Sequence, residues 1–181
     1  ENGMNLPDYL PNVTEFICEN TLLRNLPDMP NIMILNCKNS QVNKLPHMPY
    51  LTELYCSNIY ITKMPYFPNL KILECMRINV KILPYLPNLQ ILNCSGSNLS
   101  VIPSLPKLEK LNCSNTKLTI LPPMPKLKLL ICTNTVIKRL PNLPNLENLN
   151  CVNTKIRSLP YFPKLQRIST DRTFYYFEGT N

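Results

Sequence analysis

Residues 108–126 read LEKLNCSNTKLTILPPMPK, and the same arrangement begins again at Leu127. The clearest mark of this repeat is a cysteine column in which every consecutive pair is 19 positions apart: Cys18, Cys37, Cys56, Cys75, Cys94, Cys113, Cys132 and Cys151. Self-similarity at a period of about 20 residues indicates stacked units, each too small to bury its own apolar face. The sequence therefore predicts a linear array and not a single globular core.

The repeat frame divides the chain into three parts. We expect a lead-in or N-terminal cap over residues 1–12, eight 19-residue repeats over 13–164, and a partial ninth repeat with a C-terminal cap over 165–181. In the ninth unit Thr170 stands where a cysteine is expected. An aromatic run follows, and we interpret it as a cap because a repeat array needs a special element over its open end; the other interpretation is a partner anchor. The run is Phe174, Tyr175, Tyr176 and Phe177.

Each unit carries the signature of a short strand. Leu111 and Cys113 alternate with Asn112, which places two apolar side chains on one side and a polar one on the other. The chain has 19 prolines and 3 glycines, and the prolines near the end of each unit favour an extended return path with no room for a full helix. The predicted fold class is mainly β, a solenoid with a parallel concave sheet and an extended convex side with little or no helix.

This pattern resembles the leucine-rich-repeat family, whose consensus LxxLxLxxNxL is matched here as LxxLxCxxTxI over roughly residues 6–172. The ending Leu83-Pro84-Tyr85-Leu86-Pro87 is similar to the short repeats of bacterial effectors of the IpaH and YopM kind. The asparagine- and lysine-rich composition also looks like that of giant-virus leucine-rich-repeat proteins. The catalytic ubiquitin-ligase domain of IpaH-like proteins has no counterpart in this sequence. The resemblance implies an exposed concave sheet that receives a protein partner.

The cysteine column has three interpretations, which are buried apolar side chains, disulfides and metal ligands. We favour free buried thiols because all eight share one inward column, the spacing is not the CxxC of zinc sites, and His47 is the single histidine. No metal or cofactor is expected. Free thiols in this number fit a reducing compartment, so we expect a cytoplasmic protein, and the cytosol of a host cell satisfies the same condition.

Two polar columns follow the cysteines. Two positions on, asparagine recurs and suits a tight turn, because it tolerates unusual backbone angles; these residues are Asn20, Asn39, Asn58, Asn115, Asn134 and Asn153. One position later stands a hydroxyl residue, which we expect to bond to backbone groups of the neighbouring unit. These residues are Thr21, Ser40, Ser97, Thr116, Thr135 and Thr154.

The outward strand positions hold the candidate partner-binding site. Apolar residues of units two to five should cluster there within an acidic and basic rim that includes Arg77, and unit seven offers a second anchor. The site residues are Ile34, Glu53, Tyr55, Ile72, Glu74, Met76, Ile91, Leu129 and Ile131. The alternative is that strands favour β-branched residues and that single exposed isoleucines are ordinary.

Basic residues recur just beyond the strands and should form a stripe along one flank, interrupted at Ser100 and Thr119. They are Arg24, Lys44, Lys63, Lys81, Lys138, Arg139 and Arg157. Such a stripe could follow a phosphate backbone or an anionic surface, or simply keep the solenoid solvated. Nucleic acid is disfavoured because aromatic residues are sparse along the stripe. The net charge of +8 bears mainly on solubility and on the rate at which the chain meets acidic surfaces.

Catalysis has little basis in the sequence. One histidine cannot build a Ser-His-Asp or Cys-His arrangement, and the glycines are too scattered for a phosphate loop. Glu53 and Glu74 are a conceivable carboxylate pair, but an open sheet offers no closed pocket to tune them. We expect a chain that is not an enzyme. The sequence also has no run long and apolar enough to predict a membrane span.

The sequence thus favours a non-catalytic protein-binding scaffold, a monomer or weak oligomer, compatible with a pathogen or viral protein acting on host partners. The alternative is a nucleic-acid or anionic-surface binder that uses the basic flank. A third possibility is an extracellular or virion-surface structural protein. For that route, the sequons at Asn12, Asn93, Asn98 and Asn112 would be open to glycosylation, which is awkward for a binding face.

Overall fold

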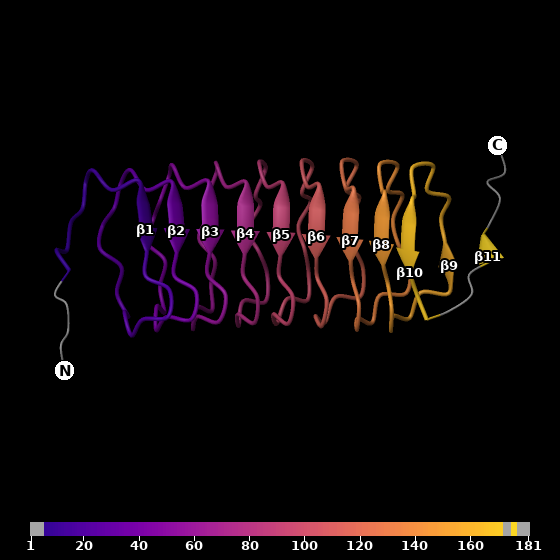
Figure 1. Ribbon diagram of the computed structural model, residues 1–181, viewed down its shortest axis with the longest axis horizontal. Helices are drawn as coiled ribbons and strands as arrows, with labels where there is room; N and C mark the ends of the chain where they lie inside the picture. The colour runs from indigo at the N-terminus through magenta and orange to yellow at the C-terminus, as the bar shows by residue number, and fades with distance from the viewer. Residues whose placement is uncertain (1–5, 172–174, 177–181) are drawn as a thin grey trace.

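The computed structural model describes residues 6–171 and 175–176. Nine strands, one per repeat, form a single parallel sheet in chain order, except that β10 follows β8 directly, and they stand in a row along the long axis (Figure 1). Their bounds are β1 (Glu15–Ile17), β2 (Ile34–Asn36), β3 (Glu53–Tyr55), β4 (Ile72–Glu74), β5 (Ile91–Asn93), β6 (Lys110–Asn112), β7 (Leu129–Ile131), β8 (Asn148–Asn150) and β10 (Arg167–Ser169). The predicted parallel solenoid is confirmed.

The register of the sheet equals the sequence period. Leu54 lies opposite Leu73, and Leu73 lies opposite Leu92, so the same repeat position stacks on itself from strand to strand. The segments between strands run back in extended form, as the proline content predicts. Over residues 6–171 and 175–176, no helix is long and apolar enough to cross a membrane.

The core is a set of inward columns. The central residue of each strand from β2 to β8 and the cysteine that follows are almost fully buried; Leu73 and Cys75, for example, are 0% exposed. The side of the core opposite the sheet is closed by Met48, Phe67 and Leu86, which lie in the segments between strands. All eight cysteines are buried and free, as the favoured interpretation predicts. The end strands are less covered, because each has a neighbour on one side only; Ile168 of β10 is 37% exposed.

The turn after each strand needs a left-handed residue, and the asparagine column supplies it. Asn134 and Asn153 have φ of 55° and 54°, and the amide of Asn153 donates to the Asn134 side-chain oxygen at 2.8 Å. Equivalent bonds join Asn20 to Asn39 to Asn58, and Asn115 to Asn134. The ladder is interrupted at Arg77 (φ 54°) and Gly96 (φ 66°). The predicted turn role of asparagine is confirmed.

The hydroxyl column behaves differently from the prediction. Each hydroxyl donates to the cysteine carbonyl of its own unit, three residues earlier, as Ser97 does to Cys94 at 2.6 Å and Thr116 to Cys113 at 2.7 Å. The expected bond to the neighbouring unit was therefore wrong. The cause is local: that cysteine carbonyl lies at the start of the turn, within reach of a side chain three residues later.

The C-terminal segment pairs with the last full repeat. β11 (Tyr175–Tyr176) runs parallel to β9 (Ser158–Leu159), and the two lie side by side at the C-terminal end of the array (Figure 1). Phe174 and Phe177, the other members of the predicted aromatic cap, lie outside the described residues. The backbone pairing fits an element that covers the open end.

The buried thiols predict a steep loss of stability in alkali. Burial raises the pKa of Cys18 to about 11 and of Cys37 to about 12 from the ordinary 9.0, and raises those of Cys56 and Cys75 well above it. A thiol whose pKa is higher in the folded state stabilises the fold fully below pH 9, and that contribution is lost as the pH rises through the folded value. Each thiol should lower the free energy of unfolding by about 1.4 kcal/mol per pH unit in this window. Urea unfolding at pH 8, 9.5 and 10.5 measures it.

The matched control is Cys56→Ala combined with Cys75→Ala. This variant should be less stable at pH 8 but should lose stability more slowly above pH 9, because two titrating groups are gone. An unchanged slope would show that the thiols do not titrate as buried groups.

Arg77 predicts a stabilising substitution. It adopts a left-handed backbone where the other non-glycine residues of its column are asparagine, and this conformation costs an ordinary side chain about 1 kcal/mol or more. Arg77→Asn should raise the free energy of unfolding by about 0.5–1 kcal/mol, because asparagine tolerates the angle. Arg77→Ala keeps the unfavourable backbone and should give no such gain. Equal stability of the two variants in urea unfolding would contradict this explanation.

Candidate functional site

The outward strand positions form a continuous half-exposed face, which we call the sheet face. All nine predicted site residues have intermediate exposure, and eight of them lie in strands while Met76 comes two residues after β4. Ile72 lies opposite Ile91, so these two form an apolar pair. Glu53 lies between Ile34 and Ile72 in the register. The structure thus joins part of the predicted patch and separates Ile34 from it.

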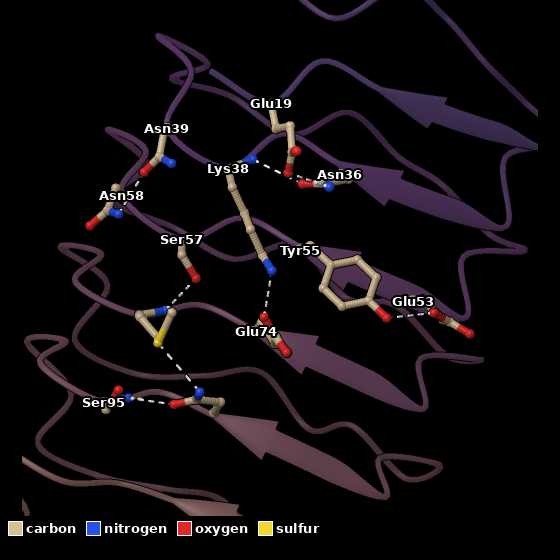
Figure 2. A network of polar contacts seen from close by, with 12 residues as sticks. Glu19, Asn36, Lys38, Asn39, Glu53, Tyr55, Ser57, Asn58, Glu74 and Ser95 are labelled. Carbon is tan, nitrogen blue, oxygen red and sulfur yellow. Dashed lines mark hydrogen bonds and ion pairs between the residues drawn. The ribbon is translucent and has the colours of Figure 1, made fainter. Parts of the chain in front are cut away.

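A polar network runs along the C-terminal ends of β2, β3 and β4 on this face (Figure 2). Lys38, which comes two residues after β2, reaches over β3 and pairs with Glu74 of β4, with Nζ 2.6 Å from the carboxylate oxygen. On its way the ammonium lies 4.8 Å from the centre of the Tyr55 ring, close enough for a cation–π contact. Lys38 and Glu74 side chains are only 27% and 30% exposed, so water screens the pair less than on an open surface.

Tyr55 is fixed from its other end as well. Its hydroxyl donates to Glu53 Oε2 at 2.7 Å, within the same strand (Figure 2). The hydrogen bond to this carboxylate, then burial, raise the pKa of Tyr55 to about 12. The ring is therefore held between a cation on its face and an anion at its hydroxyl, which leaves a rigid, half-exposed aromatic surface.

Met76 is positioned by its neighbours. Its backbone N–H donates to Ser57 Oγ at 3.0 Å, and the Asn93 amide lies 3.3 Å from its sulfur. Three units earlier in the array, the Asn36 amide donates to Glu19 at 2.8 Å. At these places the end of a strand is tied to the neighbouring unit by side chains as well as by the backbone.

The sequence prediction did not include Lys38 among the site residues and did not identify the partners of the two acids. Glu53 and Glu74 lie on neighbouring strands, but one accepts the Tyr55 hydroxyl and the other pairs with Lys38, so they do not act as a carboxylate pair. Arg77 is exposed at the turn. A basic residue following one strand, with an aromatic and an acid on the next two, was the available signal for this network.

The second predicted anchor, Leu129 and Ile131, lies on β7. Leu129 has Lys110 opposite it on one side and Asn148 on the other, and Ile131 lies between Asn112 and Asn150. Both are half-exposed. This apolar pair is isolated among polar neighbours and is separated from Ile91 by β6.

All seven predicted basic flank residues are exposed. Arg24 donates to Gln41 at 2.8 Å, and Lys138, Arg139 and Arg157 line a shallow depression of about 700 Å³. An apolar row runs beside the stripe, one repeat position after Lys81 and after the predicted interruptions at Ser100 and Thr119, and the sequence prediction missed it: Ile82, Val101 and Ile120 are 64%, 50% and 71% exposed. The prediction had considered only the charged residues at these repeat positions.

Solved structures provide the comparison, whereas neither a protein-family model nor a curated protein matches the sequence. A Leptospira interrogans LRR protein, LIC12759, is 26% identical with a TM-score of 0.71, over 80% of this chain and 44% of that one. The functional domain of InlJ from Listeria monocytogenes, which includes a cysteine ladder, is 21% identical with a TM-score of 0.72, over 88% and 44%. YopM from Yersinia enterocolitica is 20% identical with a TM-score of 0.61, over 92% and 52%.

The chain has the leucine-rich-repeat fold. It spans about half or less of the length of these three proteins. The resemblance predicted from the repeat pattern is confirmed at the level of the fold. The likeness to InlJ and YopM shows this fold alone, so the residues of the sheet face must support any functional argument.

The exposed side chains of the leucine-rich-repeat sheet are suited to contacts with another macromolecule. Among the described residues, no three His, Cys, Asp or Glu side chains come together as a metal site would require. Shallow depressions lie before the strands β1–β5, over units three and four, and beside Lys138. The sheet face itself is an open surface with one fixed aromatic ring, an apolar pair and a charged network, features that are typical of a macromolecular interface.

The Lys38–Glu74 pair predicts a measurable coupling. In a double-mutant cycle with Lys38→Met and Glu74→Gln, we expect a coupling free energy of about 1 kcal/mol, because both groups are partly withdrawn from water. The exposed Lys128–Glu109 pair, at 2.8 Å, is the matched control and should couple more weakly. Urea unfolding of the four chains in each cycle measures both values. Equal couplings would mean that the position over Tyr55 adds nothing.

Proposed function

We propose that this leucine-rich-repeat chain is a non-catalytic protein-binding scaffold whose partner docks on the sheet face around Tyr55, Ile72 and Ile91. One observation supports it most: the Tyr55 ring is fixed by Lys38 and Glu53 while it stays half-exposed. A pre-organised aromatic side chain loses little conformational freedom on binding. Tyrosine is also among the residues that dominate binding energy at interfaces.

The surroundings of Tyr55 support the same proposal. The Ile72–Ile91 pair gives an apolar centre, and the Lys38–Glu74 pair gives a charged rim. An apolar core within a polar rim is the usual anatomy of a protein interface. Leu129 and Ile131 would provide a second, weaker contact at the far end. The full set of proposed contact residues is Ile34, Glu53, Tyr55, Ile72, Glu74, Met76, Ile91, Leu129 and Ile131.

Similar structures lend this proposal general support. The LRR protein FLRT2, 16% identical with a TM-score of 0.58, is solved within an octameric complex with Latrophilin 3 and Unc5D. We place the scaffold in a reducing compartment, such as a host cytosol, because eight free buried thiols fit such surroundings. A pathogen or viral protein that acts on host partners as a monomer or weak oligomer fits this description.

The test is affinity capture from extract of the source or host cell, quantified by mass spectrometry. The combined variant Tyr55→Ala and Ile72→Asp should lose at least tenfold of any partner that the wild type captures at near-stoichiometric amounts, because truncating a residue that dominates an interface costs about 2 kcal/mol or more. Circular dichroism must show that the variant stays folded.

The matched control changes the convex side instead. Tyr66 and Tyr85 are exposed at 50% and 53%, and Tyr66→Ala combined with Tyr85→Asp introduces the same alanine and aspartate away from the sheet face. Partner capture should match that of the wild type. A partner retained by the sheet-face variant but lost by this control would move the binding site to the convex side.

A further inference from the structure

Charge is segregated on the surface beyond the strands. In the eight cysteine-containing units, positions four to seven after the cysteine carry nine of the chain's 19 lysines and arginines and not one aspartate or glutamate. All nine side chains are exposed. They are Arg24, Lys44, Lys63, Lys81, Lys117, Lys138, Arg139, Lys155 and Arg157.

The same positions hold six of the exposed large apolar side chains. Between the basic residues stand Leu22, Tyr60, Ile82, Val101, Ile120 and Val136, which are 79%, 74%, 64%, 50%, 71% and 44% exposed. The backbone at these repeat positions is extended, and Ile82 and Val101 form a parallel bridge. We call these fifteen residues the flank surface; with strands about 4.8 Å apart, it runs roughly 35 Å along the solenoid.

The two kinds of side chain share one surface. Lys63 and Lys81 line a shallow depression of about 520 Å³ together with Ile82, and Val136 lines the depression of Lys138, Arg139 and Arg157. The flank surface is therefore a band of protruding aliphatic groups interspersed with cations. Isolated exposed aliphatic residues are ordinary, but their alignment along a band whose only charged residues are positive is not explained by solubility.

We propose that the flank surface docks onto the headgroup region of an anionic lipid bilayer. A bilayer offers negative charge at every point along the band and hydrocarbon directly beneath it, so aliphatic side chains can enter while lysines and arginines stay with the headgroups. The chain would then lie along the membrane with its long axis parallel to it. The sheet face carries the acids Glu53 and Glu74 and is a separate surface, so it stays available to a partner.

The composition of the band favours a bilayer over nucleic acid. Nucleic acid satisfies the cations but has no place for branched aliphatic side chains, and contacts to single strands need aromatic residues on which bases stack. Tyr60 is the one aromatic residue within the flank surface. Phosphate contacts alone would also leave Ile82, Val101 and Ile120 exposed to water.

The test is co-sedimentation of the chain with vesicles of phosphatidylcholine containing 30% phosphatidylserine, against vesicles of phosphatidylcholine alone. We expect preference for the anionic vesicles and loss of binding at high salt. Lys138→Gln, Arg139→Gln and Arg157→Gln together should weaken binding about a hundredfold, from about fivefold per cation near a charged leaflet. Ile82→Ser, Val101→Ser and Ile120→Ser together should weaken it about tenfold or more.

Matched controls separate this surface from net charge. Lys107→Gln, Lys126→Gln and Lys164→Gln remove the same charge from three exposed lysines elsewhere and should leave binding within about threefold of the wild type. Equal loss in this control, or no preference for anionic vesicles, would overturn the proposal. So would wild-type binding by the aliphatic variant together with tighter binding to duplex DNA, which would assign the flank to nucleic acid. Partner capture through the sheet face is unaffected by any of these outcomes.

Discussion

The fold depends on one constraint: the 19-residue period must match the strand register so that every inward face is covered by its two neighbours. Leu54, Leu73 and Leu92 stack directly on one another, and a shift of one residue would turn each leucine to the outside. No unit can bury its own face, so stability is shared along the array. The less buried end strands β1 and β10 are the direct consequence.

The sequence predicted the features that follow from position in the repeat, and it missed the contacts that depend on how far a side chain extends. The buried Leu–Cys columns and the left-handed asparagines follow from position in the repeat. Lys38 contacts the Tyr55 ring one strand away and the Glu74 carboxylate two strands away. These contacts depend on the length and rotamer of the lysine side chain, and its position in the repeat does not specify the rotamer. The hydroxyl column was placed correctly but given the wrong carbonyl, because a sequence position does not choose between two nearby acceptors.

The regular backbone leaves two surfaces free to differ from unit to unit. On the sheet face, Tyr55 and its charged partners make one fixed site within an otherwise mixed surface. Beyond the turn, Ile82 and its equivalents add exposed aliphatic groups beside the basic stripe. Because neither set lies in the stacked core, single substitutions there should change the free energy of unfolding by no more than about 1 kcal/mol, the coupling expected of Lys38 and Glu74.

The reactivity of the buried cysteine thiols is the most direct test of this account. Thiols should be titrated with a disulfide reagent under native conditions and then in denaturant without reductant. We predict eight reactive thiols per chain after unfolding, with those of the central units, Cys56 to Cys132, reacting in the native state only as fast as the chain unfolds. Rapid native labelling of these central cysteines, or fewer than eight thiols in denaturant, would contradict a continuous core built from stacked 19-residue units.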